Sequence, residues 1–151
     1  MDLTRALLDG GARFLQLRAK HLPSADLLDL AAAIAELARP RGARLIVNDR
    51  ADLARLANAD GVHLGQDDLP PAAVRAIVGA DAIVGVSTHT VEQIDRAVGE
   101  PVSYVAIGPV FGTTTKATGY EAVGLEIVRA AAERAARRGL PLVAIGGITL
   151  A

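Results

Sequence analysis

The chain contains no cysteine, no tryptophan and only 3% aromatic residues. Without cysteine it can form neither disulfides nor thiolate metal ligands, so thiol and redox chemistry are excluded. No run of 18 apolar residues occurs, and no apolar secretory segment follows the first five residues, which argues against a membrane span or a signal peptide. Lys plus Arg total 16 against 17 for Asp plus Glu, a formal net charge of −1, so no basic field gathers nucleic acid or anionic membrane. We expect a cytoplasmic protein with neither partner.

The composition is that of one globular domain. The 151 residues are 51% hydrophobic and 22% charged, which excludes disorder and fibrous repeats, and no linker divides the chain. We therefore predict a single domain over residues 1–151, with a core of Ala, Val, Leu and Ile. Arginine occurs 14 times but lysine only twice, at Lys20 and Lys116, which suggests specific roles for the two lysines.

Short apolar runs recur along the chain, each followed by a segment with helical spacing. They are too short for helices and too continuously apolar for half-exposed strands, which favours buried parallel strands. The six runs are 14–17, 45–47, 61–64, 83–86, 104–107 and 142–145. Alternation of strands and helices predicts an α/β domain, either a doubly wound sheet or a (β/α) barrel.

Helix boundaries are marked by capping and terminating residues. We predict that Ser24 caps a helix that stops at Pro40, and that Thr90 caps a helix over 91–98. Two further helices are predicted over 72–78, after Pro70-Pro71, and over 125–138, before Gly139.

Polar residues gather where the predicted strands end, which is where parallel α/β folds bind ligands. Strand alternation places Gln16, Arg18 and Lys20 on one face and Leu15 and Leu17 on the other. The polar face should meet a ligand, because three such groups in a dry core would be costly. The alternative is that Lys20 has left the strand and is only solvated.

Two strand ends carry carboxylates, in Asn48-Asp49 and Asp67-Asp68. A pair of carboxylates suits Mg²⁺, which binds proteins through one or two carboxylates together with water and substrate phosphates. Arg18, Lys20 and Lys116 add the cations that pyrophosphate binding requires. The alternative is that Asp49 and Asp68 are helix N-caps.

Two other segments have the chemistry of anion sites. The hydroxyls, backbone amides and ammonium group of 113–116 form a plausible anion nest, and Gly146-Gly147 would let backbone amides approach a second anion, unless these glycines only make a turn. Of the histidines, His63 is expected in the core or at its edge and His21 in solvent, whereas His89 could contact a ligand.

Taken together, these motifs resemble the thiamine phosphate synthase family, in the superfamily that it shares with the TenI-type thiazole tautomerases. The resemblance extends from Gly10 to Thr149. It implies a TIM barrel and a Mg²⁺-dependent transferase that joins hydroxymethylpyrimidine diphosphate to thiazole phosphate, giving thiamine phosphate and pyrophosphate. Its partners would be these small-molecule substrates.

The resemblance also implies a role for individual residues. It assigns Gln16, Arg18, Lys20 and Asn48 to the pyrimidine diphosphate, and Asp49 and Asp68 to Mg²⁺. It assigns Thr113, Thr115 and the backbone of Gly147 to the thiazole phosphate. The candidate catalytic groups are Lys116 on the diphosphate, Arg18 and Ser87.

The chain is short for this fold, because a (β/α)₈ barrel has about 200 residues or more. We therefore expect about six of the eight strands, without strand 1 and the strand 8 region, and a truncated product that self-associates and shows negligible synthase activity alone. Two alternatives stay open, a TenI-like tautomerase and a non-catalytic phosphate-binding fragment. Oligomeric state and kinetics cannot be predicted from the sequence.

Overall fold

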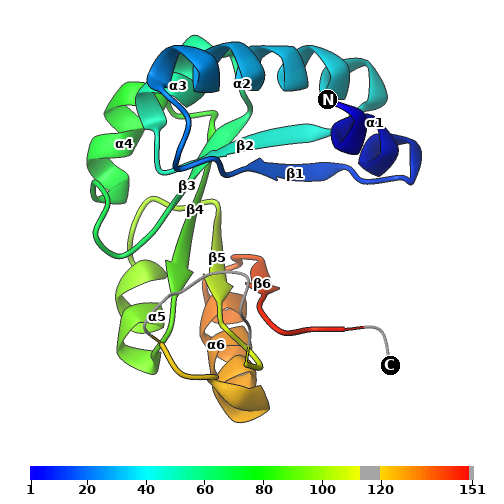
Figure 1. The fold of residues 1–151 in the computed structure, drawn as a ribbon. Coiled ribbons are helices and arrows are strands. Elements are labelled where there is room, and N and C mark those ends of the chain that lie inside the picture. Colours follow the sequence, from blue (N-terminus) through cyan, green and yellow to red (C-terminus); the bar gives the residue numbers. More distant parts are fainter. Residues whose placement is uncertain (113–119, 150–151) are drawn as a thin grey trace. The chain divides into compact units, whose positions relative to one another are not determined.

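A computed structural model describes residues 1–112 and 120–149 of the chain (Figure 1). It divides into two compact units, Met1–Leu64 with Ala73–Val84, and Gly65–Ala72 with Gly85–Ala151. The prediction of a single domain stays a prediction. Among the predicted site residues, Thr113, Thr115 and Lys116 lie outside the described residues.

The first unit is a parallel three-stranded sheet with its helices. The chain runs through α1 (Asp2–Asp9), β1 (Phe14–Leu17), α2 (Ser24–Ala38), the 3₁₀ turn η1 (Arg39–Arg41), β2 (Arg44–Asn48), α3 (Ala51–Leu56) and β3 (Gly61–Leu64). Most of α4 (Pro71–Val78) belongs to the same unit. The strands lie in the order β1-β2-β3, with Leu15 in register with Leu45 and Val47 with Val62.

The apolar runs form this sheet because both faces of its centre are buried. Leu45, Ile46 and Val47 of β2 are at most 1% exposed, as expected for a parallel strand covered on both sides. Along β1 the exposure alternates, and Leu15 and Leu17 pack against a cluster of Ile34, Ala35 and Leu45. The predicted alternation of Leu15, Gln16 and Leu17 is confirmed, but β1 ends at Leu17, so Arg18 and Lys20 lie beyond the strand.

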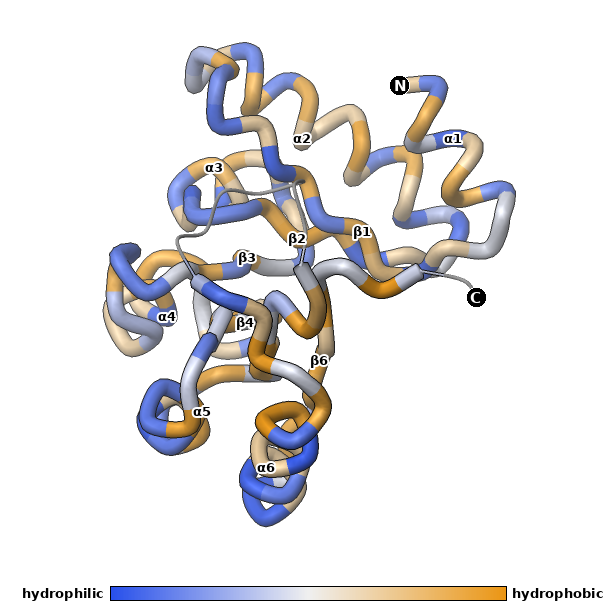
Figure 2. The backbone as a smooth tube through the Cα atoms, turned by 60° about the horizontal axis from the view of Figure 1, so that its bottom comes forward, coloured by the Kyte–Doolittle hydropathy of each residue, from blue (hydrophilic) through white to orange (hydrophobic). Residues whose placement is uncertain are grey.

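The second unit repeats the strand-helix order. Its elements are β4 (Ile83–Thr88), which begins in the first unit, α5 (Val91–Ala97), β5 (Tyr104–Ile107), α6 (Gly124–Arg137) and β6 (Leu142–Ala144). The strands are parallel in the order β4-β5-β6. Along α6, hydrophobic and hydrophilic positions alternate (Figure 2), with Ala131 and Ala135 buried.

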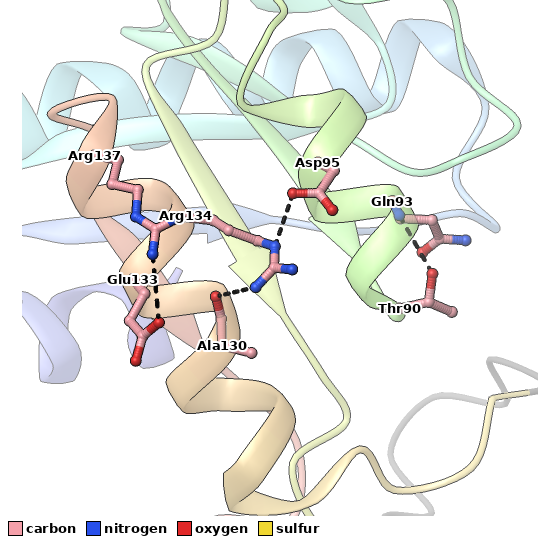
Figure 3. Close-up of polar contacts among 7 residues, drawn as sticks. All are labelled: Thr90, Gln93, Asp95, Ala130, Glu133, Arg134 and Arg137. Carbon is pink, nitrogen blue, oxygen red and sulfur yellow. Dashed lines mark hydrogen bonds and ion pairs between the residues drawn. The ribbon is translucent and has the colours of Figure 1, made fainter.

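Side-chain contacts fix the two helices of this unit (Figure 3). Arg134 Nε on α6 donates to Asp95 Oδ1 on α5 over 2.7 Å. Thr90 caps α5 as predicted, because its Oγ1 accepts from the Gln93 N–H at 3.3 Å. This cap sets the direction in which α5 leaves the end of β4.

The sequence-based element boundaries hold to within two residues. Strand β2 begins at Arg44 and β4 continues through Thr88, whereas β6 ends at Ala144. The prediction that Ser24 caps α2 is wrong, because Pro23 is the N-cap and no side chain caps the helix. The Ser24 hydroxyl instead accepts from Arg50 Nη1 at 2.9 Å. No residue range was predicted for helix α3.

Candidate functional site

An ion pair joins the carboxyl ends of the first two strands. Lys20 Nζ lies 2.9 Å from Asp49 Oδ2. Lys20 follows β1 and Asp49 follows β2, so adjacent parallel strands bring together two residues that are 29 positions apart. The Lys20 side chain is 51% exposed and that of Asp49 is 21% exposed, which leaves the pair accessible from solvent.

The backbone of Asp49 has an unusual conformation that a hydrogen bond holds in place. Its φ angle is +64°, in the left-handed region that residues other than glycine seldom occupy, with Asn and Asp the usual exceptions. Its N–H donates to the carbonyl of His63 on β3 at 2.8 Å. The alternative that Asp49 caps the following helix is wrong, because the N-cap of α3 is Arg50.

Other polar residues lie near the same strand ends. Gln16, Arg18 and Lys20 are all exposed, and the residues between them are half-buried. Asn48 ends β2 in register with His63, which is only 7% exposed. The first unit therefore presents two cations, an amide pair and a carboxylate at one end of its sheet.

A second charged cluster flanks Asp49. The Arg50 guanidinium binds Asp52 through two hydrogen bonds of 2.9 and 2.6 Å and also reaches Ser24. The hydrogen bond to Asp52 raises the pKa of Arg50, and the same bond lowers the pKa of the Asp52 carboxyl. This cluster ties the start of α3 to the start of α2, and the sequence analysis did not identify it.

In the second unit, Asp68 and Ser87 each have a hydrogen-bond partner near Gly65. Asp68 Oδ2 accepts from the Gly65 N–H at 2.7 Å. Gln66 Nε2, which was not predicted to matter, donates to the Ser87 carbonyl at 2.6 Å. Asp68 and Ser87 are half-buried, and the contacts hold the Asp68 carboxylate and the Ser87 backbone.

The glycine pair after β6 is required by packing. Gly147 has φ +68°, and a Cβ there would lie 2.7 Å from the carbonyl oxygens of Phe111 and Gly112. A Cβ at Gly146 would lie 2.7 Å from Pro109 Cβ. The backbone arrangement alone explains both glycines, and phosphate binding by Gly147 stays a prediction.

His89 stacks on Tyr120, with ring centroids 3.7 Å apart and planes 14° from parallel. Its Nδ1 hydrogen-bonds the Gly108 carbonyl, and its N–H donates to Gln93 Oε1 at 2.6 Å. Gln93 Nε2 also reaches Tyr120 Oη at 3.5 Å. The sequence analysis missed Gln93 and Tyr120, although Thr90-x-x-Gln93 is a capping-box pattern that could have indicated the first.

The residues present fit a magnesium ion by their chemistry. Asp49 and Asp68 supply hard oxygen donors, and Asp49 already binds a cation, the Lys20 ammonium. Among residues 1–112 and 120–149 no group of three or more His, Asp or Glu is arranged for a metal, but Mg²⁺ commonly takes only one or two protein carboxylates. A hollow of about 450 Å³ at the opposite ends of the strands, lined by Arg44, Asp60 and Ile83, contains none of the predicted site residues.

Within each unit, parallel strands alternate with helices, which defines a protein of the α/β class. The sequence model of the thiamine monophosphate synthase family matches residues 1–151, and the chain belongs to this family. Within the described part of the chain, no helix is long and apolar enough to cross a membrane.

Individual relatives agree with this assignment. The chain is 47% identical to thiamine-phosphate synthase of Roseiflexus sp. (strain RS-1), over 99% of its own length and 62% of the relative's. It is 49% identical to the Acidothermus cellulolyticus protein of the same name, over 96% and 68% of the two lengths. Thiamine phosphate pyrophosphorylase from Pyrococcus furiosus superposes with a TM-score of 0.86 at 32% identity, over 98% of this chain and 69% of that one. The predicted barrel-type fold is thus confirmed, and the chain spans about two thirds of the length of these relatives.

Proposed function

We propose that the chain forms the diphosphate- and metal-binding part of a thiamine phosphate synthase. The observation that carries this proposal is the contact between Lys20 and Asp49 at the ends of β1 and β2. One residue suits an anionic phosphate and the other a divalent cation, and a metal–diphosphate complex needs both at the same place. The family membership supplies the reaction to which such a site belongs.

The chain's own residues would bind and orient the pyrimidine diphosphate. Arg18 offers a planar pair of donors that matches phosphate oxygens, and Lys20 offers a mobile point charge. Gln16 and Asn48 would hydrogen-bond the pyrimidine end. Asp49 and Asp68 would hold Mg²⁺, which when bound neutralises the charge on the diphosphate oxygens.

In the proposed reaction, the bond between the pyrimidine methylene carbon and the diphosphate oxygen breaks, and its electron pair leaves with pyrophosphate. The thiazole nitrogen then donates its lone pair to that carbon, and no proton is transferred. Lys116 and Arg18 would stabilise the departing charge, with Ser87 beside the reacting groups. Thr113, Thr115 and the Gly147 backbone would hold the thiazole phosphate. Catalysis then consists of positioning and charge stabilisation, without a nucleophilic residue.

Calorimetric titration with hydroxymethylpyrimidine diphosphate, in MgCl₂ and in EDTA, tests the proposal. We expect binding that depends on Mg²⁺ and that Asp49→Ala abolishes. Asp52→Ala is the matched control, because it removes a carboxylate three residues away that Arg50 holds. A tautomerase would not bind the diphosphate, and a non-catalytic phosphate-binding domain would bind it equally well in EDTA; either result would refute the proposal.

A further inference from the structure

The two members of the Lys20–Asp49 pair are suited to ligands of opposite charge. Lys20 Nζ and Asp49 Oδ2 are 2.9 Å apart. The charge of each residue therefore neutralises the charge with which the other would bind its ligand. A metal ion that approaches Asp49 meets an ammonium group, and a diphosphate that approaches Lys20 meets a carboxylate. Like charges at such distances repel even in a solvated site.

Only one of the two residues can readily change partner. The backbone of Asp49, from which its short side chain extends, is left-handed and is held by its N–H bond to the His63 carbonyl. The Lys20 side chain is 51% exposed and ends in three donors on a flexible four-carbon stem. Lys20 can therefore move from the carboxylate to a phosphate oxygen while Asp49 stays in place.

We propose that the Lys20–Asp49 ion pair makes the site selective for the metal–diphosphate complex over either free ion. When both components arrive, Lys20 turns to the diphosphate and the metal takes its place beside Asp49, so that opposite charges are adjacent throughout. When only one arrives, it must compete with the ion pair. This inference rests on the proposed function and deepens it, because it states which form of the substrate the site accepts.

The effect of the Lys20–Asp49 ion pair on ligand binding has a predicted size, and it must act on the cation and on the anion alike. Exposed ion pairs are weak, and their usual strength corresponds to about 2–5-fold in an equilibrium constant. Because binding is linked, breaking the pair from either side should favour the ligand of the residue left behind by a similar factor. Lys20→Met should therefore help the cation, and Asp49→Asn should help the anion.

Two separate titrations test this on the 151-residue chain, one with MgCl₂ alone and one with sodium pyrophosphate in EDTA. We expect Lys20→Met to bind Mg²⁺ about 2–5-fold more tightly than the unmodified chain, and Lys20→Arg to match the unmodified chain. Arg50→Met is the control for general loss of positive charge, since Arg50 is held by Asp52. For pyrophosphate, Asp49→Asn should bind about 2–5-fold more tightly, and Asp52→Asn should not. Asparagine tolerates the left-handed backbone of position 49.

The outcomes separate the inference from the proposed function. If both ions bind the unmodified chain but the variants at positions 20 and 49 change nothing beyond their controls, the inference is wrong and the proposed function stands. If neither ion binds any form of the chain, both fail.

A spectroscopic measurement checks the pair itself. Only two lysines are present, so ¹³Cε-labelled lysine gives two side-chain signals, and Lys20→Arg identifies that of Lys20. Asp49→Asn should shift the Lys20 signal and leave that of Lys116 in place. An unshifted Lys20 signal would show that the pair does not form in solution and would overturn the inference.

Discussion

The ring of Tyr104 on β5 occupies the space in which a side chain at Gly85 on β4 would lie. The two residues are in register across the parallel pair, and a Cβ at position 85 would overlap the ring carbons and the hydroxyl of Tyr104. Tyr104 is 6% exposed, so its ring cannot move into solvent without losing its packing. This glycine, two residues before Ser87, is thus explained by packing within the sheet.

We expect Gly85→Ala to lower the free energy of unfolding by about 2–3 kcal/mol, because an added methyl group in a packed core forces neighbouring groups out of position. Urea denaturation measures the change. Gly112→Ala is the control, since a Cβ there meets open space, and Tyr104→Leu should reduce the penalty in the double variant. Equal stability of both alanine variants would contradict the account of this contact.

Burial of Tyr104 predicts a stability loss at high pH. Desolvation raises the pKa of Tyr104 from 10.0 to about 12, so between these values the unfolded chain loses the phenolic proton and the folded chain keeps it. Stability from this group is complete below pH ~10 and falls as pH rises, at up to about 1.4 kcal/mol per pH unit. Chemical denaturation between pH 9 and 12 should show a shallower fall for Tyr104→Phe than for Tyr120→Phe. Parallel curves would contradict the prediction.

The apolar run of β6 is mostly exposed, contrary to the predicted burial, but the central strands were predictable because hydrophobic runs encode burial, as in Leu45-Ile46-Val47. The end of β4 was not, since Thr88 is polar by type yet 0% exposed. Its burial is made possible by the hydrogen bond that Oγ1 donates to the Ala106 carbonyl at 2.7 Å, a partner 18 residues away. Local sequence does not reveal such partners.

The candidate site likewise has features that the sequence predicts and features that it does not. The polar face of β1 follows from strand periodicity, whereas the left-handed Asp49 and the choice of Arg50 as the α3 cap depend on contacts with β3 and α2. No range was predicted for helix α3 because its six residues are too few to show a helical period.

Lys116 remains a prediction from the sequence, since it lies outside the described residues. If it stabilises the departing diphosphate, Lys116→Ala should lower kcat by roughly 10²–10³. A solvated surface lysine would change stability by less than about 0.5 kcal/mol and leave the rate unchanged. Steady-state kinetics of a chain with synthase activity decides between these, and a rate equal to that of the unmodified enzyme would exclude Lys116 from catalysis.

Exposed apolar side chains on both units predict self-association. Leu3 is 73% exposed and Phe14 is 50% exposed in the first unit, and Ile145 and Ile148 are 58% and 57% exposed in the second. Apolar groups beside a strand edge favour association. Size-exclusion chromatography with light scattering should show species larger than the 15.6 kDa monomer, and Phe14→Ser with Ile145→Ser should reduce them. A monomeric chain at high concentration would refute this prediction.

Thiamine phosphate formation by an extended chain tests the central claim most directly. This chain matches 62% of the Roseiflexus relative, and the terminal segments of that relative would be joined to residues 1–151. The extended chain would be incubated with both substrates and Mg²⁺, and thiamine phosphate would be measured by chromatography. We predict thiamine phosphate and pyrophosphate in equal amounts, lost on Asp49→Ala and retained on Asp52→Ala. A folded, monodisperse extended chain that forms no product, or that stays active with Asp49→Ala, would contradict the claim that these residues form the diphosphate and metal site.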